Sequence, residues 1–150
     1  MSKFMILPIY YIHNKTTNKG EKTMRDLKIR DEQLLEEALK NNVEGFFQDL
    51  QKAFDYGSED YDEDYFITDD IFDIKVLSDL NKTFFGACYQ IAFGGPNIYI
   101  NTYDNVVEGY WGGTKIIENL EYYLDSLGLD DKFELLETLD DYIEELFECR

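Results

Sequence analysis

The chain has 150 residues and a formal net charge of −18, from 32 acidic and 14 basic residues, with 44% hydrophobic and 16% aromatic content. A chain of this length forms a single domain that removes roughly 70% of its unfolded surface from water, and so high an apolar content excludes a disordered protein. The negative field repels nucleic acid and anionic membranes and attracts basic surfaces, so we do not expect direct binding to DNA or RNA.

Histidine and cysteine content excludes several kinds of site. The single histidine, His13, excludes Ser-His-Asp, Cys-His and multi-histidine metal sites as they are usually built. The two cysteines, Cys88 and Cys149, are too few for a disulfide framework, and no signal peptide precedes them. The apolar run 4–12 is too short to span a bilayer. These features indicate a reduced, cytoplasmic protein without a cofactor.

Residues 1–23 differ from the rest of the chain. Residues 1–30 carry seven bases and two acids, whereas residues 31–150 carry 30 acids and seven bases. The apolar segment 4–13 predicts an edge strand, followed by a basic loop. A second interpretation is that translation starts at Met24, because codons for residues 19–21 can encode a purine-rich ribosome-binding sequence. In either case we expect residues 24–150 to form one α+β domain.

From Asp31 the pattern becomes helical and extends to Gly57. Apolar residues recur at steps of three and four, namely Leu35, Leu39, Val43, Phe46, Leu50 and Phe54. Asp31 is an expected N-cap and Gly57 an expected stop. Gly45 and the preceding asparagine pair weaken the middle of this helix, where a kink or a division into two helices would fit the pattern.

The most densely charged segment, 58–70, is predicted to be a loop. Its acids are Glu59, Asp60, Asp62, Glu63, Asp64, Asp69 and Asp70, with no base among them. The frame that starts at Asp60 does not fit an EF-hand, because Tyr65 and Ile71 stand where that loop needs glycine and a bidentate glutamate. We therefore expect no metal site. The next segment, 71–80, fits either a strand or a short helix.

The stretch 84–113 has little charge and predicts a three-stranded antiparallel meander over about 84–112. The strands are expected at 84–93, 97–103 and 106–111, with turns at Gly94–Pro96 and Asp104–Asn105. A two-residue second turn would pair Tyr99 with Tyr110. The face that carries Ile98, Ile100 and Val107 is expected to pack on the helices. Trp111 is expected in the core, although the glycines around it also fit a ligand pocket.

Two helices are predicted in the last third, over 117–127 and from Asp130 onward, so that three or four acidic helices cover the meander. The final helix carries a row of acids at helical spacing, with neighbours ~5–6 Å apart: Glu134, Glu137, Asp141, Glu144, Glu145 and Glu148. Acids in the last turn oppose the helix dipole at roughly 0.3–1 kcal/mol each, and like-charged neighbours add a few tenths more. Because interleaved lysines would remove this cost, we interpret the row as functional.

In composition and size, the acidic segments 31–80 and 116–149 resemble the small DNA mimics of phages and mobile elements, namely anti-CRISPR and antirestriction proteins. The resemblance implies an inhibitor, without enzymatic activity, that binds a basic nucleic-acid-binding protein such as a Cas9-type CRISPR effector or a restriction enzyme. The expected contacts are the acids of segment 58–70 and the row on the final helix. One alternative is an immunity protein or antitoxin that blocks a basic nuclease toxin, and another is a ligand-binding module with a pocket near Trp111.

Overall fold

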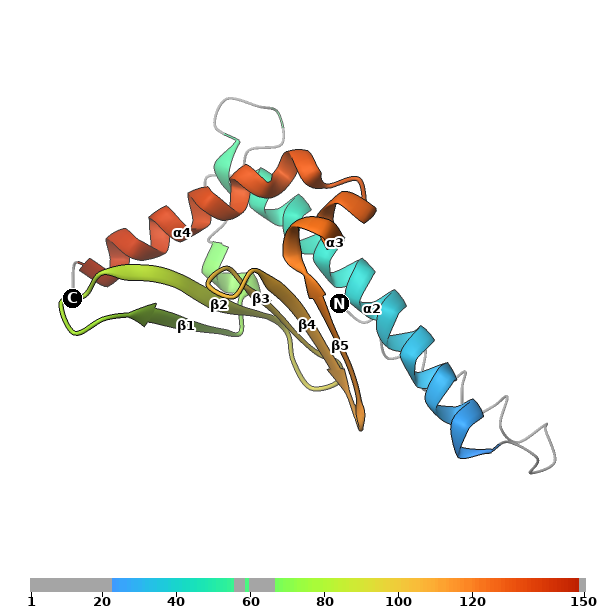
Figure 1. Cartoon of the computed structure of the whole chain (residues 1–150). Coiled ribbons are helices and arrows are strands. Elements are labelled where there is room, and N and C mark those ends of the chain that lie inside the picture. The colour runs from blue at the N-terminus through green and yellow to red at the C-terminus, as the bar shows by residue number, and fades with distance from the viewer. Residues whose placement is uncertain (1–22, 56–58, 60–66, 149–150) are drawn as a thin grey trace.

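The computed structural model describes residues 23–55, 59 and 67–148 (Figure 1). The predictions for residues 1–22 lie outside this range. The elements in chain order are α2 (Met24–Phe54), the 3-10 turn η2 (Ile67–Asp70), β1 (Asp73–Ser78), β2 (Phe84–Ala92), β3 (Asn97–Asn101), β4 (Val106–Trp111), β5 (Thr114–Asn119), α3 (Leu120–Ser126), the 3-10 turn η3 (Asp130–Lys132) and α4 (Phe133–Glu148).

The strands form one antiparallel sheet in the order β1-β2-β3-β4-β5, and α2, α3 and α4 lie on one side of it (Figure 1). The α+β class is therefore confirmed, but the three-stranded meander is wrong because the sheet has five strands. The segment 71–80, for which the sequence left two alternatives, contains strand β1. The other additional strand, β5, occupies the start of the segment predicted as a helix from Ile117.

Strand β5 exists because Gly112 and Gly113 close a two-residue hairpin after Trp111. Gly112 adopts a φ of +56°, and Trp111 pairs with Thr114 across the turn. The helix starts three residues later than predicted, where the Asn119 side-chain oxygen accepts the N–H of Tyr122 at 3.0 Å. This N-cap satisfies an N–H that would otherwise lack a partner at the start of the helix.

The β3–β4 register differs by two residues from the prediction. Tyr99 pairs with Glu108 instead of Tyr110, because residues 102–105 form a four-residue loop. The Asn101 side-chain oxygen accepts the N–H of Asp104 at 2.9 Å and closes this loop. A shift of two residues leaves every side chain on its own face of a strand. The predicted core face is therefore confirmed: Ile98, Ile100 and Val107 are fully buried.

Helix α2 begins seven residues before the predicted start at Asp31 and runs without a break past Gly45. A capping box explains the early start, because the Thr23 hydroxyl accepts the N–H of Asp26 while the Asp26 carboxylate accepts the N–H of Thr23. In the middle of the helix, buried Asn42 donates its amide N–H to the Ala38 carbonyl oxygen at 2.8 Å, so its burial leaves no unpaired amide nitrogen.

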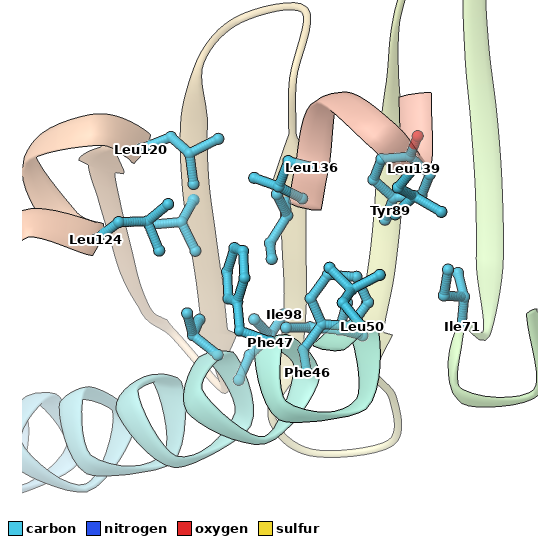
Figure 2. Close-up of a cluster of buried hydrophobic side chains, with 14 of the residues drawn as sticks. Phe46, Phe47, Leu50, Ile71, Tyr89, Ile98, Leu120, Leu124, Leu136 and Leu139 are labelled. Atoms are coloured by element: carbon cyan, nitrogen blue, oxygen red, sulfur yellow. The ribbon is translucent and has the colours of Figure 1, made fainter. Parts of the chain in front are cut away.

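The core lies between the three helices and one face of the sheet (Figure 2). Helix α2 supplies Leu39, Val43, Phe46, Phe47 and Leu50, α3 supplies Leu120 and Leu124, and α4 supplies Leu136, Leu139 and Ile143. Each large apolar side chain removed from water in this way stabilises the fold by about 1.5–3 kcal/mol. Within the described residues, no helix has the length and hydropathy needed to cross a bilayer.

Two glycines provide a matched test of this packing. Gly86 has a φ of +151°, and a Cβ atom there would lie 2.8 Å from the backbone of Tyr103, so we expect Gly86→Ala to destabilise the fold by about 2–4 kcal/mol. At Gly45, in α2, an added Cβ atom would point into open space, so Gly45→Ala should stabilise the fold by about 0.5–1 kcal/mol. Urea unfolding measures both, and equal effects would contradict the described packing.

Candidate functional site: the acidic face of α3, η3 and α4

Exposed carboxylates are frequent on three consecutive elements of the chain, α3, η3 and α4. We call the exposed acids of three consecutive elements the acidic face. Its members are Glu121 and Asp125 on α3, Asp130 and Asp131 on η3, and Glu134, Glu137, Asp141, Glu145 and Glu148 on α4. The acids of α3 and η3 are not among the contacts predicted from the sequence. The signal that could have identified them is the scarcity of basic residues, which extends over α3 and η3 as well as α4.

Helix α4 separates apolar from acidic side chains. Its inner side is buried against the core through Leu136, Leu139 and Ile143. The predicted row lies on its outer side, where all members are exposed except Glu144, which is half-buried. The apolar stripe and the acid row both follow the helical period, so packing of the stripe directs the row toward solvent.

The charge density of the row is close to that of a nucleic-acid strand. From Glu134 to Glu148 the helix advances about 21 Å at ~1.5 Å per residue. The five exposed acids of the row thus provide one negative charge about every 5 Å, compared with about 3.4 Å along one strand of DNA. A groove of lysines and arginines that binds the phosphates of a nucleic-acid strand could therefore pair with several carboxylates along α4.

One lysine interrupts this acidic part of the chain. Lys132 is the single base between residues 116 and 148, and its Nζ donates to the Gln51 side-chain oxygen on α2 at 2.9 Å. This contact holds the ammonium group against α2. Lys132 therefore lies at the junction of η3 with α2 and does not alternate with the acids along α4.

Asp140 is the acid of α4 that faces inward. Its carboxylate accepts the hydroxyl proton of fully buried Tyr89, on β2, at an O–O distance of 2.5 Å. Burial raises the pKa of Asp140 and outweighs the hydrogen bonds from Tyr89 and Thr102, which lower it. This bond joins α4 to the middle of the sheet and helps to fix the rotation of the helix, so that its other acids stay on the outer side.

The negative field continues from β5 onto helix α2. Burial raises the pKa of the Tyr123 hydroxyl on α3, and the charges of Glu118, Glu44 and Glu36 raise it further. Glu118 belongs to β5, whereas Glu36 and Glu44 belong to α2. Acids from two further elements therefore surround one tyrosine next to the acidic face, which enlarges the surface that can attract a basic partner.

The acids of segment 58–70 that were predicted to contact the partner differ in position and exposure. Asp60, Asp62, Glu63 and Asp64 lie outside the described residues, and Glu59 is exposed in a turn. Asp69, in η2, is exposed, but Asp70 turns toward α2 and shares a hydrogen bond with Asp49. Burial and this contact raise the pKa of Asp49 to about 6, while Lys52 lowers it. Asp70 is thus part of a carboxyl pair between two elements and not of an outward row.

Trp111 is half-buried on β4 and does not belong to the core cluster, so the expected core position is wrong. The neighbouring residue Tyr110 lines a shallow depression of about 400 Å³ on the side of the sheet away from the helices. Its other lining residues are Lys75, Cys88, Asn97, Tyr99 and Glu108. Trp111 is not among them, because successive residues of a strand point to opposite faces.

Within residues 23–55, 59 and 67–148, no group of three or more histidine, cysteine or acidic side chains is arranged to hold a metal ion. Comparison with known proteins gives no match: no family model, no curated protein and no solved structure is significantly similar to this chain.

The Asp49–Asp70 pair predicts an unusual dependence of stability on pH. Because the pKa of Asp49 is about 6 in the folded protein, against an ordinary value of 3.8 for an unperturbed aspartate, the folded state binds more protons between these values. The pair therefore contributes stability at low pH that is lost as the pH rises through about 6. Asp49→Asn, which cannot ionise, should raise the unfolding free energy at pH 8 by about 1 kcal/mol, since solvent screens this partly exposed pair.

The same substitution should have little effect at pH 4, because the loss of stability only begins near the ordinary pKa of 3.8 and is complete above about 6. Asp125→Asn, at an exposed position of α3, removes the same charge and serves as the control. Urea unfolding from pH 4 to pH 8 measures both variants. Parallel stability profiles for the two variants would contradict a shared proton between Asp49 and Asp70.

Proposed function

We propose that this protein is an acidic inhibitor that binds a basic nucleic-acid-binding protein through the acidic face and occupies the surface that the partner uses for nucleic acid. A Cas9-type CRISPR effector or a restriction enzyme is the first candidate for the partner. The observation that carries the proposal is the row on α4, in which five exposed acids follow one another without an intervening base.

Electrostatics supports this kind of partner over others. Like charges repel, so a chain with a net charge of −18 is kept away from nucleic acid and from anionic membranes. A cleft lined by arginine and lysine attracts it, and long-range attraction of this kind raises association rates by orders of magnitude. The spacing of acids on α4 lets several basic side chains pair at once.

A rigid support makes such a surface suitable for competition with nucleic acid. Helix α4 is fixed to the sheet by its buried apolar side and by the bond between Asp140 and Tyr89. The carboxylates therefore need not be ordered from a flexible chain, and less free energy is lost in ordering them when the partner binds. Unlike a phosphodiester backbone, the helix presents the partner with no bond of the kind that a nuclease cleaves.

The row can be tested by neutralising two of its members. Glu137→Gln combined with Asp141→Asn should weaken partner binding about tenfold, or ~1.4 kcal/mol, because two adjacent charges at the centre of the row are lost. Glu37→Gln combined with Asp73→Asn removes two exposed charges from α2 and β1 and should change binding less than twofold. Binding is measured at low and high salt against purified partners.

The panel of partners contains a guide-loaded Cas9-type effector, a restriction enzyme and a basic nuclease toxin. A basic protein without a nucleic-acid-binding function controls for unspecific attraction. Binding to the effector or the restriction enzyme that weakens with salt supports the proposal, because salt screens exposed charge pairs. Binding to the toxin alone would instead favour an immunity protein. Equal losses in the two double variants would contradict the assignment of the acidic face.

A further inference from the structure

The face of the sheet opposite the helices differs in chemistry from the rest of the molecule. We call it the open face. It consists of alternate side chains of all five strands: Asp73, Lys75 and Leu77 on β1, Cys88 and Gln90 on β2, Asn97, Tyr99 and Asn101 on β3, Val106, Glu108 and Tyr110 on β4, and Lys115, Ile117 and Asn119 on β5. No helix of the described residues covers it (Figure 1).

Charge on the open face is balanced. It carries two acids, Asp73 and Glu108, and two lysines, Lys75 and Lys115. The chain as a whole has 32 acids and 14 bases, and seven of those bases precede residue 31. The open face is thus a neutral surface on a strongly negative molecule, directly opposite the acidic face.

The open face also presents apolar side chains to solvent. Ile117 is 50% exposed and Leu77 is 37% exposed. In the middle of the sheet, the rings of Tyr99 and Tyr110 meet edge to face at a centroid distance of 6.0 Å. Tyrosines that are held in place by a neighbour are effective anchors of protein interfaces, because little side-chain freedom is lost on binding.

We propose that the open face is an interface with a second copy of this chain, formed by packing the two sheets face to face. The charge distribution favours this occupant. Two identical molecules that each carry −18 repel one another through their acidic faces, and the open face is where two copies can meet without adding to that repulsion. This inference is independent of the proposed function, since it concerns the opposite side of the sheet.

Distance removes most of the remaining repulsion. Packed sheets lie about 10 Å apart, and a helix layer adds about as much on either side. In the dimer the two acidic faces would therefore be separated by more than about 30 Å, several times the Debye length of about 8 Å at physiological salt. The pairing is self-complementary, because a two-fold axis along β3 sets β1 of one copy opposite β5 of the other.

The size of the face indicates a weak dimer. Five strands at about 4.8 Å separation and about 3.3 Å rise per residue give a flat footprint of about 400 Å². With side-chain relief, two copies would bury on the order of 1,000 Å² in total, near the lower limit for a specific interface. We therefore expect a dissociation constant on the order of 10–100 µM.

Sedimentation equilibrium over a concentration series tests the dimer directly. Ile117→Glu places a carboxylate on the open face and should weaken dimerisation at least tenfold. Tyr122→Glu adds the same charge on α3, where the tyrosine is 77% exposed, and should change it less than twofold. Both positions are exposed, so the fold should tolerate either substitution, and thermal unfolding checks that it does.

A second pair of variants tests the balance of charge. Lys115→Glu makes the open face negative, whereas Lys40→Glu makes the same change on the exposed side of α2. Lys115→Glu should abolish the dimer at concentrations where the Lys40→Glu variant is still dimeric. Higher salt should strengthen the dimer slightly, because it screens the small repulsion that remains between the copies, which is the opposite of its expected effect on partner binding.

Three results would overturn the inference. The first is a monomer at all concentrations up to about ten times the expected dissociation constant. The second is a dimer that Ile117→Glu and Lys115→Glu leave intact, because the copies would then meet elsewhere. The third is a dimer that dissociates as salt is raised. A dimer weakened by the two open-face variants and kept by their controls supports it.

Discussion

Repulsion between carboxylates is the constraint that the rest of the structure accommodates. Residues 31–150 hold 30 acids and seven bases, and compaction brings these acids closer together than in the unfolded chain. The fold limits the cost by burying one apolar side of each helix on a single face of the sheet, so that most acids point outward into water. Among the described residues, Asp140 and the Asp49–Asp70 pair are acids that instead bond to other side chains. Asp140 accepts a hydrogen bond from Tyr89, and burial raises the pKa of both Asp49 and Asp140.

The sequence predicts the parts of this fold that depend on local periodicity. The apolar stripe and acid row of α4 follow the helical period, and alternation along β3 and β4 identifies their buried face although the register differs by two residues. Strand β5, over residues 114–119, was not predicted because its isoleucines, Ile116 and Ile117, fit a helix and a strand equally well. The start of α2 was predictable from the Thr23–Asp26 capping box, a local signal that the apolar pattern from Asp31 obscured. The Asp49–Asp70 and Tyr89–Asp140 contacts join distant residues, so no local pattern indicates them.

The two sides of the molecule suit different interactions. The acidic face offers many charges on a rigid support, which favours fast association with a basic partner and sensitivity to salt. The open face offers tyrosines and balanced charge, which favours contact with another neutral surface. If both interactions occur, a dimer joined through the open faces presents its two acidic faces on opposite outer sides, and each can engage a partner without obstructing the other.

Competition between this protein and nucleic acid is the central claim, and a DNA-binding titration tests it most directly. A fluorescent DNA target is titrated with the partner at increasing concentrations of this protein. Occupation of the nucleic-acid-binding surface predicts that the apparent dissociation constant for DNA rises in proportion to the concentration of this protein, without a limit and without a change in the signal at saturation. An apparent dissociation constant that stays constant, or that reaches a plateau while this protein remains bound, would contradict the account.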